Sequence, residues 1–304
     1  MLSDCFAKPI IYYGNYLNNA IMRHEKHPLE TINKWLDERG IAVLDNVTRM
    51  PVYDEPYISP YLIIALNHRG WVKVDYDMQP TKFQAHDHVV IYPNHILTAH
   101  ESSDDYLCTL LVVSPHFLKI LSQLHPKHYL FEYHYNTSLH LKNKQFETML
   151  TCFKMLQTLS QLEHPERDEM LIMQMDITAR IVRNIIRENG KEMIHKETAV
   201  QQMLSRFHED IVLHYRESRE VRFYAELQNL TPKYFGTVIR EATGIGVGEW
   251  IANYVIVQAK FLLRHQSNLT IQQVSNKLGF KEQTTFSRYF KTYTGMSPKE
   301  YRES

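Results

Sequence analysis

Residues 279–302 read GFKEQTTFSRYFKTYTGMSPKEYR, and this stretch decides the class of fold. Gly279 suits a tight turn, and apolar residues then recur at helical spacing. The side chains expected to face inward are Phe286, Phe290 and Tyr293. The side chains expected to face outward are Gln283, Thr284, Ser287, Arg288 and Lys291. A helix with a polar, basic outer face is therefore predicted after the turn.

A second short helix is predicted just before this turn. Leu269-Thr270 is a typical helix start, because a Thr side chain can bond the free N–H groups of a first turn. Ile271, Val274 and Leu278 follow at helical spacing and form one apolar face. Two helices joined by a tight turn are the pattern of a helix-turn-helix unit.

The same pattern occurs about 50 residues upstream. One helical run ends at Asn229-Leu230, and Thr231-Pro232 favours the start of another, since Pro suits a first helical turn. The buried face of this helix is expected to comprise Phe235, Val238, Ile239 and Ala242. The outward side chains are expected to be Lys233, Gly236, Thr237 and Arg240.

These two outer faces predict contact with duplex DNA. Small residues let a helix approach base edges in the major groove, while Lys and Arg neutralise phosphates. A long helix predicted over Glu249 to His265 joins the units and could hold both on one face of a duplex, whose successive major grooves lie about 34 Å apart. Residues 201–304 carry 14 basic and 10 acidic residues, which weakly supports a polyanionic partner.

Many positions in this region share their spacing with a known signature. In the second unit they are Gly279-Phe280, Thr284, Phe286-Ser287-Arg288, Phe290-Lys291, Gly295, Ser297-Pro298 and Tyr301-Arg302. Upstream they are Ala225, Leu230-Thr231-Pro232, Tyr234, Gly244, Trp250-Ile251, Ala259-Lys260 and Leu262-Leu263. With these residues, the segment 205–304 resembles the DNA-binding domain of the AraC/XylS family of bacterial transcription regulators.

The resemblance implies a sequence-specific regulator of transcription, expected to be an effector-responsive activator that works with RNA polymerase. It assigns base-edge contacts to Lys233, Gly236, Thr237, Gln283, Thr284, Ser287 and Arg288. Arg240 and Lys291 complete the expected DNA-binding set, since they share the outer faces and suit phosphate contact.

Three positions depart from the family pattern. Val247 stands where Pro is frequent, so a looser start of the connecting helix is expected. Val255 stands where a basic residue is frequent. Gly236 lies inside a helix at a cost of roughly 1 kcal/mol relative to Ala, and it removes a side chain from the groove-facing surface. The first unit is therefore expected to read sequence more weakly than the second.

The N-terminal half has a different texture. Short β-branched and aromatic runs separated by turn residues predict strands at 61–66, 71–76, 88–92 and 106–113, and so a small barrel or sandwich. Helical stripes follow, including 117–124, 146–159 and 170–186, and Glu30 to Arg39 could form a short helix. The stripes fit packing on the barrel or on a second subunit. The prediction is an α+β chain: a regulatory domain over 1–190, a linker over 191–200 and a DNA-binding domain over 201–304.

The stretch from Phe83 to Ser114 resembles the cupin-like barrel of the same family's regulatory domain. That resemblance implies a small-molecule effector and, in some members, dimerisation. The residues offered for an effector pocket are Tyr57, His68, Trp71 and His100, because they are polar or aromatic.

Two alternatives stay open. His86 and His88, joined by His95 and His100, invite a cupin metalloenzyme, but no Glu follows the His86–His88 pair within a few residues, so no metal is expected. We find no nucleophile–base pair, Gly-rich phosphate loop or zinc ligand set, and we predict neither catalytic residues nor a cofactor. The second alternative is a DNA-binding regulator without an effector.

Composition fits a globular two-domain chain of 304 residues with no formal net charge. The cysteines Cys5, Cys108 and Cys152 are odd in number and far apart, which favours a reducing compartment. The sequence shows neither an export signal nor a long apolar span, so a cytoplasmic protein without membrane contact is expected.

Overall fold

The computed structural model describes residues 36, 38–49, 56–124, 138–189, 199–266 and 268–304. The chain divides into two units, Met1–Ile194 and His195–Ser304. The division falls inside the predicted linker 191–200, most of which lies outside the described residues. The helix suggested over Glu30 to Arg39 also lies mostly outside them, although Leu36, Glu38 and Arg39 are helical.

The N-terminal unit is built on two antiparallel sheets. Its described strands are β1 (Ile41–Val47), β2 (Tyr57–Ile58), β3 (Leu62–Arg69), β4 (Trp71–Tyr76), β5 (Gln79–Gln84), β6 (Asp87–Ile91), β7 (Ile96–Ser102), β8 (Leu107–Val113) and β9 (Ser138–His140). One sheet has the order β1-β8-β3-β6-β9 and the other β2-β7-β4-β5. The expected barrel is therefore formed by two sheets, with no ladder between them among the described strands.

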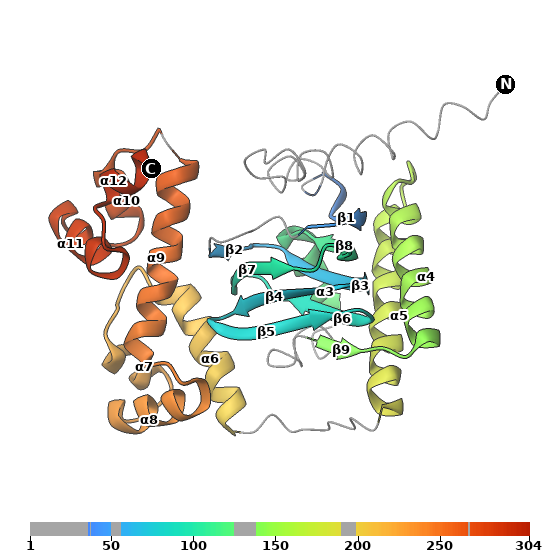
Figure 1. The fold of residues 1–304 in the computed structure, drawn as a ribbon, viewed down its shortest axis with the longest axis horizontal. Coiled ribbons are helices and arrows are strands. Elements are labelled where there is room, and N and C mark those ends of the chain that lie inside the picture. Colours follow the sequence, from blue (N-terminus) through green and yellow to red (C-terminus); the bar gives the residue numbers. More distant parts are fainter. Residues whose placement is uncertain (1–35, 37, 50–55, 125–137, 190–198, 267) are drawn as a thin grey trace. The chain divides into compact units, whose positions relative to one another are not determined.

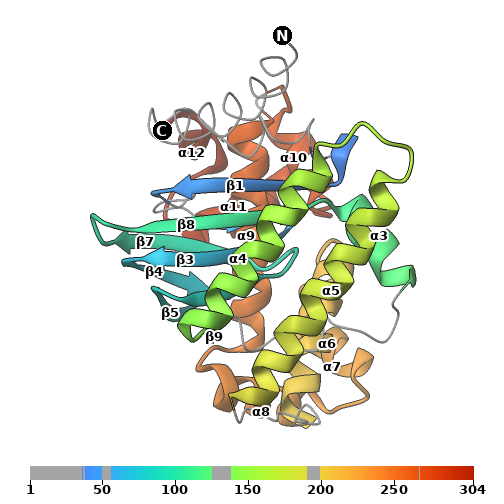
Figure 2. The same ribbon diagram turned by 90° about the vertical axis from the view of Figure 1, so that its right-hand side faces the viewer.

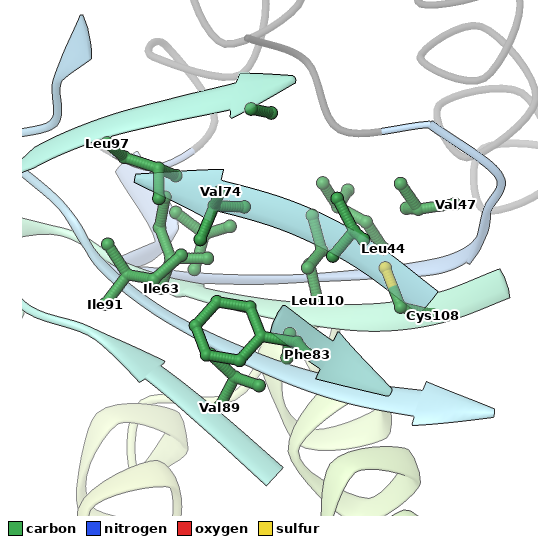
Figure 3. Close-up of a cluster of buried hydrophobic side chains, with 14 of the residues drawn as sticks. Leu44, Val47, Ile63, Val74, Phe83, Val89, Ile91, Leu97, Cys108 and Leu110 are labelled. Atoms are coloured by element: carbon green, nitrogen blue, oxygen red, sulfur yellow. The ribbon is translucent and has the colours of Figure 1, made fainter. Parts of the chain in front are cut away.

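A single apolar core lies between the two sheets. Figure 3 shows this cluster, to which one sheet contributes Val74, Phe83 and Leu97 and the other Leu44, Ile63, Val89, Ile91, Cys108 and Leu110. Alternate residues of a strand face opposite sides, so Ile63 and Ala65 enter this core while Leu62, Ile64 and Leu66 face away. β3 is thus buried on both faces, which explains its continuous apolar run.

Helices cover the outer face of the five-stranded sheet. α3 (Pro115–Leu124), α4 (Asn143–Ser160) and α5 (Arg167–Glu188) pack there, and Figure 2 shows α4 lying across the strands with α5 beside it. Phe146, Met149, Phe153 and Leu156 of α4 share a second buried cluster with Leu62, Ile64 and Leu66. Packing against the unit's own sheet therefore accounts for the wide apolar stripe of α4.

The four predicted strands exist as β3, β4, β6 and β8. The sequence prediction missed β1, β2, β5, β7 and β9. β5 reads QPTKFQ and has only Phe83 buried, so it offered almost no apolar alternation to detect. β3 also continues through Asn67 and His68, beyond the end predicted for this strand at residue 66.

The C-terminal unit is all helical. Its helices are α6 (Ala199–His214), α7 (Val221–Leu227), α8 (Pro232–Thr243), α9 (Val247–His265), α10 (Ile271–Lys277), α11 (Gln283–Thr294) and α12 (Pro298–Glu303). Figure 1 shows α9 running from the α7–α8 pair to the α10–α12 group. Phe207 of α6 is fully buried, with its ring 5.1 Å from Phe235 and 5.4 Å from Trp250. The α+β fold class is as predicted.

Candidate nucleic-acid interface

The recognition helix of the first unit, α8, is fixed at both ends. The Thr231 hydroxyl accepts a hydrogen bond from the backbone N–H of Tyr234, as its position predicts. Gly244 ends the helix in a left-handed conformation with φ 72°. Phe235 and Ile239 are fully buried, but Ala242 is exposed and Val238 half-buried. The predicted inward face was therefore one turn too long, because the helix leaves the core before Ala242.

The recognition helix of the second unit, α11, has the same inward anchors. Phe286 and Phe290 are fully buried, and the Phe290 ring lies 5.5 Å from that of Tyr301. Tyr293 is 48% exposed, so its predicted inward position was wrong. It lies in the last turn of α11, where Gly295 ends the helix with φ 80°.

The outward face of α8 has little side-chain bulk at its centre. Lys233, Thr237 and Arg240 are exposed, and a Cβ at Gly236 would meet nothing within 4 Å. The Thr237 hydroxyl donates to the carbonyl of Lys233 in its own helix, at 3.0 Å. The side chain thus offers mainly its methyl group to an incoming ligand. Arg240 also approaches Gly246, where a Cβ would lie 2.9 Å from its guanidinium.

The outward side chains of α11 are longer and more polar. Gln283, Thr284, Arg288 and Lys291 are exposed, and Ser287 is half-buried. The Thr284 hydroxyl donates to the carboxylate of Glu282 at 3.3 Å. This face carries two cations and an amide within a few turns of one helix, which suits both phosphate and base-edge contact.

A surface aromatic was missed as a candidate for the interface. Tyr234 is 56% exposed in the first turn of α8, beside Lys233. It belongs to the family signature, but no interface role was predicted for it. The sequence could have indicated this exposure, because Tyr234 lies between Lys233 and Phe235 and off the apolar stripe of the helix.

The positions that depart from the family pattern are accommodated by packing. Val247 is 3% exposed at the first turn of α9, and Val255 is fully buried in its middle. α9 begins at Val247, and Gly246 before it has no side chain that could accept a bond from the first free N–H groups. The looser start of this helix stays a prediction.

The four residues proposed for an effector pocket do not line one pocket. Trp71 lies under the ammonium groups of Lys73 and Lys82, which are 5.1 Å and 4.6 Å from its ring centroid. His100 is exposed, with Nε2 2.8 Å from a carboxylate oxygen of Asp75. Because Val72, Val74 and Ala99 enter the barrel core, Trp71 and His100 face outward from the four-stranded sheet.

The other two effector candidates lie elsewhere in the N-terminal unit. Tyr57 is half-buried and packs against the barrel core. His68 lies on the opposite, helix-covered face, with Nε2 2.8 Å from the Thr109 hydroxyl and its ring edge-on to Phe146 at 5.3 Å. Burial lowers the pKa of His68, in spite of the nearby Asp45 carboxylate.

The histidines considered for a metal site have separate partners. His86 is in a left-handed turn with φ 66°, outside β6, and its ring stacks on Phe146. His88 is buried in β6, and burial lowers its pKa to about 4. His95 Nδ1 lies 2.6 Å from a carboxylate oxygen of Asp77. Alternation along one strand therefore does not bring His86 and His88 to one face.

The geometry defines the class of the C-terminal unit: a pair of helix-turn-helix units joined by one long helix. A family model described as a helix-turn-helix domain matches residues 224–304. The Arabinose operon regulatory protein of Escherichia coli is 40% identical over 73 residues, which is 24% of this chain and 25% of that protein. The C-terminal unit is a DNA-binding domain of the AraC/XylS family.

Two further comparisons cover different shares of the chain. The Msm operon regulatory protein of Streptococcus mutans is 32% identical over 89 residues, or 29% of this chain and 32% of that protein. The chain thus spans about a third or less of the length of either curated relative. The structure of ToxT from Vibrio cholerae covers 86% of this chain and 97% of its own, at 14% identity and a TM-score of 0.43. A likeness with a TM-score this low carries no argument about function.

No helix within the described ranges combines the length and apolarity needed to cross a membrane.

Proposed function

We propose that the whole protein is a sequence-specific transcription regulator, in which the C-terminal unit binds duplex DNA and the N-terminal unit controls that binding. The observation that carries this proposal is the pair of outward faces on α8 and α11, each held on a buried aromatic anchor, Phe235 and Phe286. Both helices are supported by α9, so both faces are presented by one domain.

The two faces suggest different modes of base recognition. Arg288 can bond the O6 and N7 atoms of a guanine with two N–H groups, which is the commonest specific contact in the major groove. Thr237 directs its hydroxyl to its own helix, so its methyl group suits the methyl of a thymine. Lys233, Arg240 and Lys291 contribute phosphate contacts, which set position and affinity but not sequence.

A small-molecule effector and a homodimer belong to the same proposal. An effector would act by binding better to one of two arrangements of the regulator. For dimerisation, α5 presents Met173 and Ile177, which are 63% and 48% exposed, on the face away from the sheet. Clustered exposed apolar side chains are a frequent mark of a protein interface. Contact with RNA polymerase and activation of transcription are carried over from the family resemblance, and a cytoplasmic location fits a regulator that binds DNA. We assign no catalytic role.

The test is selection of bound duplexes from a random pool by the full-length protein at two salt concentrations. We expect a split motif whose half-sites lie about 10 base pairs apart, since two recognition helices enter successive major grooves. The contrary result is binding that weakens with salt but enriches no sequence. It would show that the helices contact only phosphates, and it would contradict the proposal.

The effector is tested separately by thermal unfolding against a panel of small sugars and aromatic compounds. A specific ligand at 100 times its Kd adds about 2.7 kcal/mol to the stability of the unit that binds it. A panel without any shift favours the effector-free regulator. Metal analysis of the purified protein tests the alternative of a cupin metalloenzyme, because such an enzyme would contain metal in a stoichiometric amount.

A further inference from the structure

The segment between α6 and α7 contacts the turn of the second helix-turn-helix unit. Arg219, in this segment, donates a hydrogen bond from Nη2 to the carbonyl of Leu278. Its guanidinium also lies over the ring of Phe280, 3.7 Å from the ring centroid. Both contacts fall on the three residues 278–280, in the connection from α10 to α11, although Arg219 precedes the first unit in sequence.

The backbone of the same segment touches the same turn. A Cβ added to Gly279 would overlap the carbonyl oxygen of Arg216, so only glycine fits this approach. Gly279 also has φ 76°, the left-handed region that glycine adopts without strain. Arg216 and Arg219 thus hold the turn from two points, one by backbone contact and one by a side chain.

The surroundings of Arg219 are aromatic and contain no acidic partner among the described residues. Burial lowers the pKa of Arg219, and the hydroxyls of Tyr289, Tyr224 and Tyr215 oppose that effect. Its Nε is buried without a hydrogen-bond partner in the described part of the chain. An arginine tolerates this setting because its planar cation stacks on rings and is weakly hydrated. Lysine has no planar group that could replace this stacking.

We infer that Arg219 is a positioning residue that fixes the spacing of the two recognition helices on DNA. Phe280 precedes α11 by three residues, so the stack on its ring sets where that helix begins. Val221, two residues after Arg219, begins α7 of the first unit. A single side chain therefore ties the start of one unit to the turn of the other. This inference rests on the proposed function, because it concerns how the two helices share one duplex.

The experiment measures how affinity depends on the distance between half-sites. The full-length protein is titrated with duplexes carrying its selected motif, with the spacer changed from two base pairs shorter to two longer. Each added base pair moves one half-site about 3.4 Å along the axis and turns it by about 35°. Wild type is expected to show a sharp optimum, since a braced domain cannot follow that displacement.

Arg219→Ala is expected to flatten this profile. Affinity at the best spacing should fall about tenfold, in the range of ordinary coupling between sites. Affinity for a duplex with one half-site should change less than about twofold, because neither recognition face is altered. The matched control is Arg222→Ala, three residues further on, whose exposed side chain pairs with Glu226 at 2.7 Å and should leave the profile unchanged.

Arg219→Lys separates the stack from the charge and covers the case in which Arg219→Ala fails to fold. It keeps a cation and a donor but loses the planar group, so it should also flatten the profile. A wild-type profile retained by both variants would overturn the inference while leaving the proposed function intact. A wild-type protein that enriches no motif would instead overturn the proposed function, and the inference with it.

Discussion

The two helix-turn-helix units follow one plan but differ in register and in surface. Their first helices begin at Val221 and Ile271, 50 positions apart, while the recognition helices begin at Pro232 and Gln283, 51 apart. The second turn therefore holds one extra residue. As a consequence, Thr237 of the first unit corresponds to Arg288, and not to Ser287 as a repeat of about 50 residues suggests.

The contacts that fold each recognition helix are repeated in the other. Thr243 donates its hydroxyl to the carbonyl of Ile239, and Thr294 donates to Phe290 in the same way. A left-handed glycine then ends each recognition helix. The parts that face outward are not repeated, since Gly236 and Thr237 become Ser287 and Arg288. The comparison teaches that one scaffold can carry two different outward surfaces.

The largest expected effect concerns the two turns. Gly279→Ala should lower the free energy of unfolding by about 3 kcal/mol, from a left-handed backbone and a clash with the Arg216 carbonyl. Asn229→Ala, at the matching position with φ 56°, should cost only about 1 kcal/mol. Hydrogen exchange of the α10 and α11 amides measures the first and that of α7 and α8 the second. Equal losses of stability in the two variants would mean that the left-handed backbone alone accounts for both costs and that the approach of the Arg216 carbonyl adds nothing.

The next effect concerns the two recognition faces. Arg288→Ala should weaken binding to the selected duplex by about 2 kcal/mol, since a good bidentate base contact is worth about 1–3 kcal/mol. Thr237→Ala removes one methyl group and a hydroxyl that is already bonded within its own helix, so it should cost less than about 1 kcal/mol. Titrations at a single salt concentration compare the two directly. A larger loss for Thr237→Ala would reverse our ranking of the units.

A smaller effect concerns matching core positions in α7 and α10. Ser275 is fully buried, and its hydroxyl has no hydrogen-bond partner within the described residues, whereas Ala225 stands at the equivalent place. Ser275→Ala should raise the free energy of unfolding by about 1 kcal/mol, because it removes an unsatisfied polar group. Ala225→Ser should lower it by a similar amount. Loss of stability in Ser275→Ala would point to a buried water bonded to this hydroxyl.

The smallest effect concerns the bare position of α8. Gly236→Ala should stabilise the helix by about 0.8 kcal/mol, since the added methyl meets nothing within 4 Å. Protection of the α8 amides from hydrogen exchange reports this gain. Reduced protection would show that the backbone conformation of the helix requires glycine at this position. The weaker base recognition expected of the first unit would then need another explanation.

The sequence predicted the DNA-binding unit well because its signals are local. Thr231 and Thr270 bond the first turns of α8 and α10, and Phe235 and Phe286 are buried, as their spacing indicated. Helix ends were predicted less well: Ala242 and Tyr293 lie in last turns that leave the core, which helical spacing alone does not reveal.

Features that depend on contacts distant in sequence were not predictable. The stack of Arg219 on Phe280 joins residues 61 positions apart, and no spacing rule connects them. The placement of the four effector candidates on different faces of the N-terminal unit was not predictable either, because it depends on how the strands pair. His68 and Trp71 are close in sequence, yet a turn and a new strand take them to different sheets.

The central claim is that the two recognition helices read different half-sites with unequal strength. It is tested most directly by selecting duplexes from a random pool with wild type, Arg288→Ala and Thr237→Ala of the full-length protein. We predict that Arg288→Ala loses the stronger half of the motif, including a guanine, while Thr237→Ala weakens only the other half. Loss of the same positions in both variants, or no change in either, would contradict the account.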